Sequence, residues 1–141
     1  MLAADGPVQP VRRTAGREMV RVLVADDNAG VRKLTRLALS FTGRYEVVGE
    51  AADGAEAVAL AETLQPDVVV LDLLMPGTSG WDALPMIRDR LPRTKVVIWS
   101  AGVVPAVDED RLIGLGAAAV VTKDRPPQAL RAAIDSVLDE E

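Results

Sequence analysis

The chain has 141 residues, of which 49% are hydrophobic and 26% charged, and its formal net charge is −5 at pH 7. A chain of this length forms one domain with a single core, and its negative charge argues against a domain that binds nucleic acid through a basic surface. The chain has no cysteine, which excludes disulfides and thiol chemistry, and no apolar run approaches the roughly 18 residues of a membrane span. We therefore expect a globular cytoplasmic domain that binds neither nucleic acid nor a membrane.

The first 19 residues contain two prolines and two glycines and no apolar run that could serve as a signal-peptide core. We interpret residues 1–19 as a disordered N-terminal tail and residues 20–141 as one domain. An alternative hypothesis is that translation begins at Met19, which directly precedes the first strand-like run.

The expected strands are short runs rich in β-branched residues, and segments with helical spacing alternate with them. In chain order the strands are Val20–Ala25, Tyr45–Gly49, Asp67–Asp72, Lys95–Ser100 and Ala118–Thr122. Four helices are indicated by apolar residues that share one face: Val31, Leu34, Leu37 and Ala38 in the first, Ala57, Leu60, Ala61 and Leu64 in the second, Leu84, Ile87 and Leu91 in the third, and Leu130, Ala133, Ile134, Val137 and Leu138 in the last. A less regular helix is expected between Asp108 and Gly114.

Five strands that alternate with five helices predict a parallel sheet with helices on both faces. The strands are apolar without polar alternation, as in sheets that are buried on both sides. The chain is therefore predicted to be a doubly wound α/β domain, in which ligands bind beyond the carboxyl ends of the strands.

Polar side chains follow four of the five expected strands. The first strand ends in Asp26 and Asp27, the third in Asp72, the fourth in Ser100 and the fifth in Lys123. Each residue alone has an ordinary explanation, because an aspartate after a strand is most often a helix cap and a single serine or lysine is usually a turn or surface residue.

Taken together, these five residues indicate a specific kind of binding site. Three carboxylates at one edge would repel one another unless a cation lies among them, and Mg²⁺ is a hard cation that takes oxygen ligands. Lys123 and Ser100 would supply a positive charge and a hydroxyl donor for an anion beside the metal. This set is typical of phosphoryl transfer, with Asp72 as the nucleophile and an aspartyl phosphate as the product.

At these positions the sequence resembles the receiver domain of response regulators in bacterial two-component signalling. The resemblance runs from about residue 20 to residue 139 and depends on four segments: "LVADDN", "LDLLMPG", "IWSAG" and "GAAAVVTK". It implies a flavodoxin-like sheet with the strand order 2-1-3-4-5.

The resemblance also implies roles for the site residues. Asp26, Asp27, Asp72 and the backbone carbonyl of Leu74 would hold Mg²⁺, and Asp72 would be phosphorylated. Ser100 would follow the phosphoryl group, with the small Ala101 beside it, and Lys123 would pair with it.

The implied partners are a histidine kinase or phosphotransfer protein as phosphoryl donor and a downstream protein target or output domain. Both the output and a possible homodimer would use the surface formed by the helix at residues 108–114, the strand at 118–122 and the last helix.

Four positions distinguish this chain from common members of the family. Val120 stands where the family commonly has a tyrosine or phenylalanine that turns inward on activation, and a valine has no ring to move. A tryptophan is unusual directly before the serine that carries the hydroxyl. Trp99 either fills space beside small neighbours or replaces the missing ring in the switch. Leu74 and Gly102 stand where family members tune the lifetime of the phosphoryl group, and neither can orient a water, so we predict a long-lived phosphoryl group.

Two other functions compete with the phosphorylation-dependent switch. The first is an interaction module with the receiver fold that no longer uses phosphate, which Val120 makes conceivable. The second is a phosphohydrolase with an aspartyl-phosphate intermediate, which would usually need an acid at the position of Leu74. The sequence leaves open whether the chain is a complete regulator or the receiver part of a longer, for example DNA-binding, protein.

Overall fold

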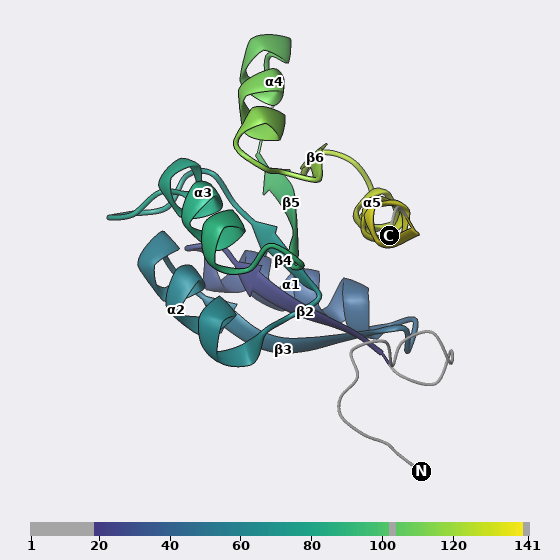
Figure 1. The fold of residues 1–141 in the computed structure, drawn as a ribbon. Coiled ribbons are helices and arrows are strands. Elements are labelled where there is room, and N and C mark those ends of the chain that lie inside the picture. Colours follow the sequence, from purple (N-terminus) through teal and green to yellow (C-terminus); the bar gives the residue numbers. More distant parts are fainter. Residues whose placement is uncertain (1–18, 102–103, 140–141) are drawn as a thin grey trace.

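The structure is a computed structural model, and it describes residues 19–101 and 104–139. Five parallel strands form one sheet in the order β3-β2-β4-β5-β6 (Figure 1). They are β2 (Val20–Ala25), β3 (Tyr45–Ala51), β4 (Val68–Leu71), β5 (Lys95–Ser100) and β6 (Ala119–Thr122). Counted along the chain this order is 2-1-3-4-5, which confirms the predicted doubly wound fold.

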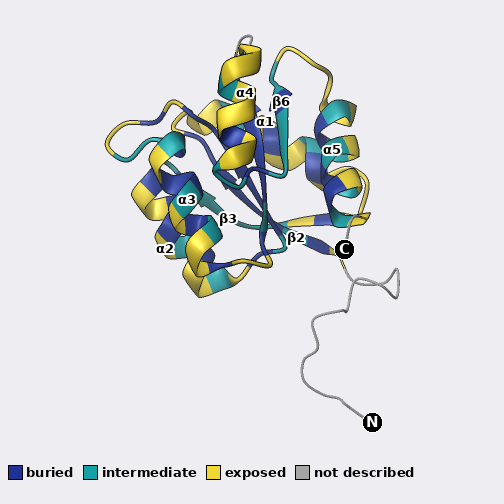
Figure 2. Cartoon of the chain, turned by 45° about the horizontal axis from the view of Figure 1, so that its top comes forward, coloured by how far each residue is buried: buried dark blue, intermediate teal, exposed yellow. Residues whose placement is uncertain are grey.

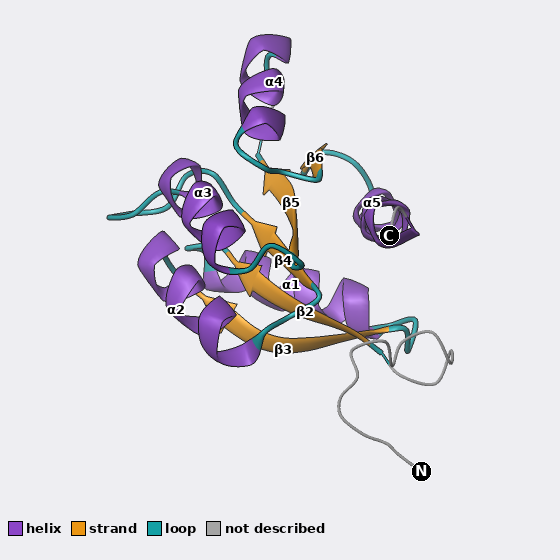
Figure 3. Cartoon of the chain, in the orientation of Figure 1, coloured by secondary structure: helices purple, strands orange, loops and turns teal. Residues whose placement is uncertain are grey.

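Five helices connect the strands: α1 (Ala29–Ser40), α2 (Gly54–Leu64), α3 (Gly80–Arg90), α4 (Ala106–Gly114) and α5 (Pro127–Asp139). Helices α1 and α5 pack on one face of the sheet, and α2, α3 and α4 contribute their buried side chains to the other (Figure 3). Every predicted strand and helix is present, and each end that the sequence predicted agrees with the structure to within two residues. The third strand excludes Asp67 and Asp72, and the second continues through Glu50 and Ala51.

The sheet is buried on both faces, as its apolar strands predict. Leu23, Val69 and Ile98 belong to the cluster under α2, α3 and α4, whereas the alternate positions Val22, Val70 and Val97 belong to the cluster under α1 and α5. The central strands are accordingly coloured as buried in Figure 2. Because successive side chains of a strand point to opposite faces, two separate cores form on the two sides of one sheet.

Helix α1 presents a different face to the core from the one that the apolar spacing predicted. Leu34 and Leu37 are 67% and 55% exposed, and the buried residues of the helix are Thr35 and Leu39. Thr35 tolerates burial because its hydroxyl donates a hydrogen bond of 2.8 Å to the carbonyl of Val31. The prediction of an inward apolar face was therefore wrong for the two leucines, which leaves part of α1 apolar and exposed.

Residues 1–18 of the predicted tail lie outside the described residues, and Met19 is a 38% exposed residue directly before β2. Over residues 19–101 and 104–139, no helix has the length and hydrophobicity needed to cross a bilayer.

Candidate functional site

Three carboxylates meet at the carboxyl edge of the sheet. Asp26 and Asp27 follow β2 and Asp72 follows β4, and one oxygen from each lies within 4.8 Å of the others. Asp26 and Asp72 are almost completely buried, at 2% and 6% exposure, whereas Asp27 is exposed. The fold thus brings the three predicted acids together, because β2 and β4 are neighbours in the sheet.

The amine of Lys123 reaches into this acidic cluster from the end of β6. It forms ion pairs with Asp26 and, at 3.5 Å, with Asp72. The backbone N–H of Lys123 donates a 2.7 Å hydrogen bond to the carbonyl of Ser100, so the loop that carries the lysine is fixed to the end of β5. One positive charge therefore faces three negative ones.

The environment of Asp72 disfavours its charged form. Burial raises the pKa of the Asp72 carboxyl, and the negative charge of Asp26 adds to this increase. Lys123 and the backbone N–H groups of Leu74 and Leu73 act in the opposite direction and do not compensate fully. A cation or a bound electrophile at this carboxylate would lower the free-energy cost of keeping Asp72 charged.

The donor set fits Mg²⁺. All three side chains offer carboxylate oxygens, which are the hard ligands that this ion requires, and the single lysine leaves a surplus of negative charge. The side chain of Leu74 is 72% exposed and points away from a buried site, so only its backbone could contribute the predicted carbonyl ligand.

Ser100 and Ala101 lie at the end of β5, on the same edge of the sheet. Ser100 is 5% exposed, and its hydroxyl donates a 3.3 Å hydrogen bond to the carbonyl of Ala101, which is exposed. Within residues 19–101 and 104–139, no hydrogen bond joins this hydroxyl to the acidic cluster.

One positioning residue was missed by the sequence analysis. The backbone N–H of Gly80, the first residue of α3, donates a 2.9 Å hydrogen bond to the carbonyl of Leu73. A Cβ atom at this position would lie only 2.0 Å from the carbonyl oxygen of Asp72. The start of α3 therefore packs against the backbone of the central carboxylate, and only glycine fits there.

Comparison with known proteins agrees with this geometry: residues 22–135 match the family described as the response regulator receiver domain. The chain belongs to this receiver domain family. The resemblance seen in the sequence is thereby confirmed.

Curated relatives of the receiver domain include longer proteins. The nitrate/nitrite response regulator protein NarL of Escherichia coli is 33% identical over 122 residues, which are 85% of this chain and 55% of NarL. A protein-glutamate methylesterase/protein-glutamine glutaminase of Anaeromyxobacter dehalogenans is 37% identical over 109 residues, covering 77% of this chain and 32% of that protein. The chain thus spans about half the length of NarL and a third of the methylesterase.

Solved structures share the fold over most of the chain. A LuxR-family two-component response regulator from Aurantimonas is 31% identical, with a TM-score of 0.82 and 88% of each chain covered. The response regulator domain of Thermotoga maritima CheB is also 31% identical, with a TM-score of 0.71 and 87% and 93% of the two chains covered.

Two of the residues that depart from the receiver pattern lie on opposite faces of the sheet. Val120 pairs with Ile98 and packs against the core under α4, whereas Trp99 pairs with Val121 and belongs to the core under α1 and α5. The Trp99 ring therefore packs in a different core from the side chain of Val120. Whether its environment changes on phosphorylation stays a prediction.

The predicted long lifetime of a phosphoryl group depended on Leu74 and Gly102. Leu74 is exposed and carries no group that could orient a water, and Gly102 lies outside the described residues.

Proposed function

We propose that this receiver domain is a phosphorylation-dependent switch of a two-component system. A phosphohistidine on a histidine kinase or phosphotransfer protein would donate its phosphoryl group to Asp72. The observation that supports this most strongly is the buried Asp72 carboxylate, held between Lys123 and two further acids at the edge of the sheet.

In the proposed reaction a carboxylate oxygen of Asp72 attacks phosphorus, a new O–P bond forms, and the P–N bond to the donor histidine breaks. The departing imidazole takes a proton from solvent. Lys123, which already lies 3.5 Å from Asp72, neutralises charge on the phosphoryl oxygens, and the Ser100 hydroxyl donates to one of them. Mg²⁺, when bound by Asp26, Asp27, Asp72 and the Leu74 carbonyl, supplies further positive charge at those oxygens.

The proposed output is a change in the surface formed by α4, β6 and α5. Ser100 and Lys123 connect the site to this region, since both stand at the ends of the strands beside it. Helix α4 exposes Val107 and Ile113, at 67% and 48%, and so offers apolar area to a downstream target, an output domain or a second copy. A cytoplasmic location is consistent with such partners.

Two alternatives have less support. A receiver-like module that ignores phosphate is favoured only by Val120, and it gives no reason for a buried carboxylate with a raised pKa. A phosphohydrolase would need a general acid near Asp72, but Leu74 is apolar and exposed. The methylesterase relative is matched over only a third of its length, so its printed activity is not proposed for this chain.

Intact-protein mass spectrometry tests the proposal directly. The wild type, Asp72→Ala and the exposed control Asp89→Ala would be incubated with acetyl phosphate, with and without Mg²⁺. We expect one added phosphoryl group on the wild type and the control, only with Mg²⁺, and none on Asp72→Ala. Absence of phosphorylation in a wild type that binds Mg²⁺ would favour the module that works without phosphate.

A further inference from the structure

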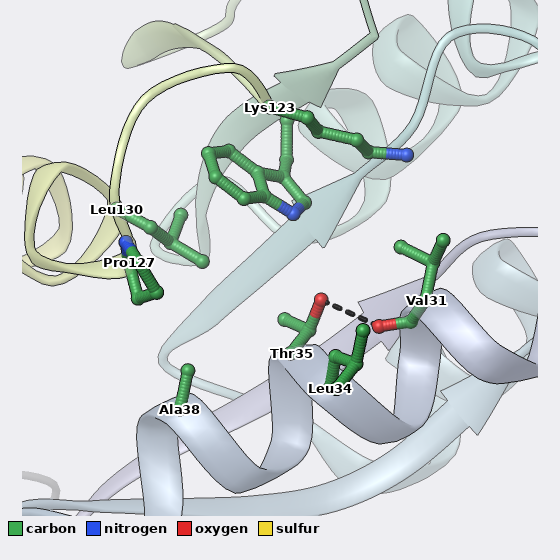
Figure 4. A pocket seen from close by; sticks show the side chains of 8 residues that line it. Val31, Leu34, Thr35, Ala38, Lys123, Pro127 and Leu130 are labelled. Carbon is green, nitrogen blue, oxygen red and sulfur yellow. Dashed lines mark hydrogen bonds between the residues drawn. The ribbon is translucent and has the colours of Figure 1, made fainter.

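A cavity of about 230 Å³ lies between α1 and α5, on the face of the sheet away from α4 (Figure 4). Its floor is Trp99, α1 contributes Val31, Leu34, Thr35 and Ala38, and α5 contributes Leu130. Leu34 is 67% exposed, so the cavity opens to solvent along the outer edge of α1. This is the region that α1 leaves uncovered because its two leucines do not face the core.

Trp99 carries an unused hydrogen-bond donor in this cavity. The residue is 9% exposed, and its indole N–H has no acceptor in the parts of the chain that the structure describes. Buried donors of this kind are nearly always paired with a protein group, a water or a ligand. The wall of the cavity therefore offers one specific polar contact to whatever enters it.

The other polar groups of the wall are already engaged. The Thr35 hydroxyl donates to the Val31 carbonyl, the bond drawn as a dashed line in Figure 4. The amine of Lys123 points away from the cavity and pairs with Asp26 and Asp72, so only its alkyl chain contributes to the lining. The remaining lining is apolar. The cavity therefore disfavours an anionic ligand, which would meet hydrocarbon on one side and the acidic cluster on the other.

Size and polarity together define a ligand class. An apolar cavity of about 150 Å³ accommodates benzene, so the present volume corresponds to roughly nine non-hydrogen atoms. We infer that the cavity binds a small neutral aromatic molecule with a carbonyl oxygen, which accepts a hydrogen bond from the indole N–H of Trp99. Its ring would pack on the indole and against Leu34 and Leu130.

A bound molecule would act next to the phosphorylation site. Trp99 directly precedes Ser100, and the Lys123 side chain is shared between the cavity wall and the ion pair with Asp72. Ligand binding would therefore change the rate at which Asp72 is phosphorylated. This consequence rests on the proposed function, whereas binding itself does not.

Nitrogen-15 NMR of the full chain tests the binding. The protein has two tryptophans, so the indole N–H of Trp81 serves as an internal control for that of Trp99, and Trp99→Phe assigns the signals. Three probes of equal size separate the contributions: acetophenone has the carbonyl, cumene lacks an acceptor, and benzoate carries a charge. We expect acetophenone to shift the Trp99 indole proton downfield with a Kd of about 1 mM or tighter, and to leave Trp81 unchanged.

Two alanine-to-leucine variants make the test specific. Ala38→Leu fills the cavity and should abolish the shift, whereas Ala59→Leu adds the same side chain to an exposed position of α2, on the other face, and should leave it intact. Cumene and benzoate should bind at least several-fold more weakly. No shift of Trp99 at millimolar acetophenone, or an equal shift in Ala38→Leu, would overturn the inference.

The coupling is measured separately, as the rate of Asp72 phosphorylation by acetyl phosphate with and without acetophenone. Equal rates at saturating acetophenone would refute the coupling and leave the binding result standing. Failure of phosphorylation under every condition would instead refute the proposed function.

Discussion

The contact between Gly80 and the backbone of Asp72 provides the sharpest structural prediction. In Gly80→Ala, the new Cβ would lie 2.0 Å from the carbonyl oxygen of Asp72 and 2.8 Å from the Cα of Leu73. Both obstacles are backbone atoms, so no side-chain rotation relieves the clash. The start of α3 and the loop after β4 must move apart.

The size of the effect follows from these distances. Ordinary contact begins near 3.4 Å, so the shortfall of about 1.4 Å at the Asp72 oxygen exceeds what small rotations absorb. Overpacking of this kind costs about 1–3 kcal/mol, and a backbone obstacle belongs to the upper end of that range. For a domain of this size we expect the melting temperature to fall by roughly 8–12 °C.

Gly114→Ala is the matched control, because a Cβ atom there would meet nothing within 4 Å and its φ is not in the left-handed region. This variant should be as stable as the wild type or more stable by up to about 1 kcal/mol. Thermal unfolding would be combined with the rate of phosphorylation by acetyl phosphate, measured well below the transition. We expect a slower rate only in Gly80→Ala. A wild-type melting temperature together with a wild-type rate in Gly80→Ala would refute the positioning role of this glycine.

Three further substitutions test the electrostatics and the packing of the domain. The raised pKa of Asp72 means that the folded state holds the carboxyl proton more tightly than the unfolded state does. Protonation of Asp72 therefore contributes fully to stability below pH 3.8, and this contribution is lost as the pH rises through the folded-state pKa. Asp72→Asn should therefore raise the free energy of unfolding at pH 7 without Mg²⁺, and raise it less near pH 4; a less stable variant at pH 7 in urea titrations would contradict this. Tyr45→Phe removes a buried hydroxyl that donates a 2.6 Å hydrogen bond to Asp135, and should cost about 2 kcal/mol in the same titrations, whereas no loss would show that the bond is not needed. Arg111→Ala removes a guanidinium 4.7 Å from the Trp81 ring, and should cost about 0.5–1 kcal/mol and speed hydrogen exchange in α4; unchanged exchange would mean that this contact does not hold the helix.

Much of the fold was determined by local features of the sequence. The runs of valine and leucine predict strands because their pattern is short, apolar and β-branched, and the order of strands and helices along the chain restricts the topology to a parallel sheet. The candidate site follows from the same reasoning. Asp26 and Asp72 come directly after strands and Ser100 ends one, and the carboxyl ends of parallel strands meet at one edge.

Other features depended on how the elements pack. Spacing alone placed Leu34 and Leu37 on an apolar face, but the orientation of α1 against the sheet buries Thr35 and Leu39 instead. The register that pairs Ile98 with Val120 and Trp99 with Val121 decided that Trp99 and Val120 serve different cores. Neither the rotation of a helix nor the register of a strand is encoded by neighbours in the chain, because both are set by side chains that are distant in sequence.

The close approach of Gly80 to Asp72 and the cavity over Trp99 belong to this second group. A glycine at a helix start has several local explanations, and a tryptophan in a strand predicts burial but not an unpaired N–H. The sequence determined which chemical groups stand at the edge of the sheet, through the covalent order of strand and loop. Only the tertiary structure decided their distances, their burial and the space left between them, because these depend on atoms brought together by folding.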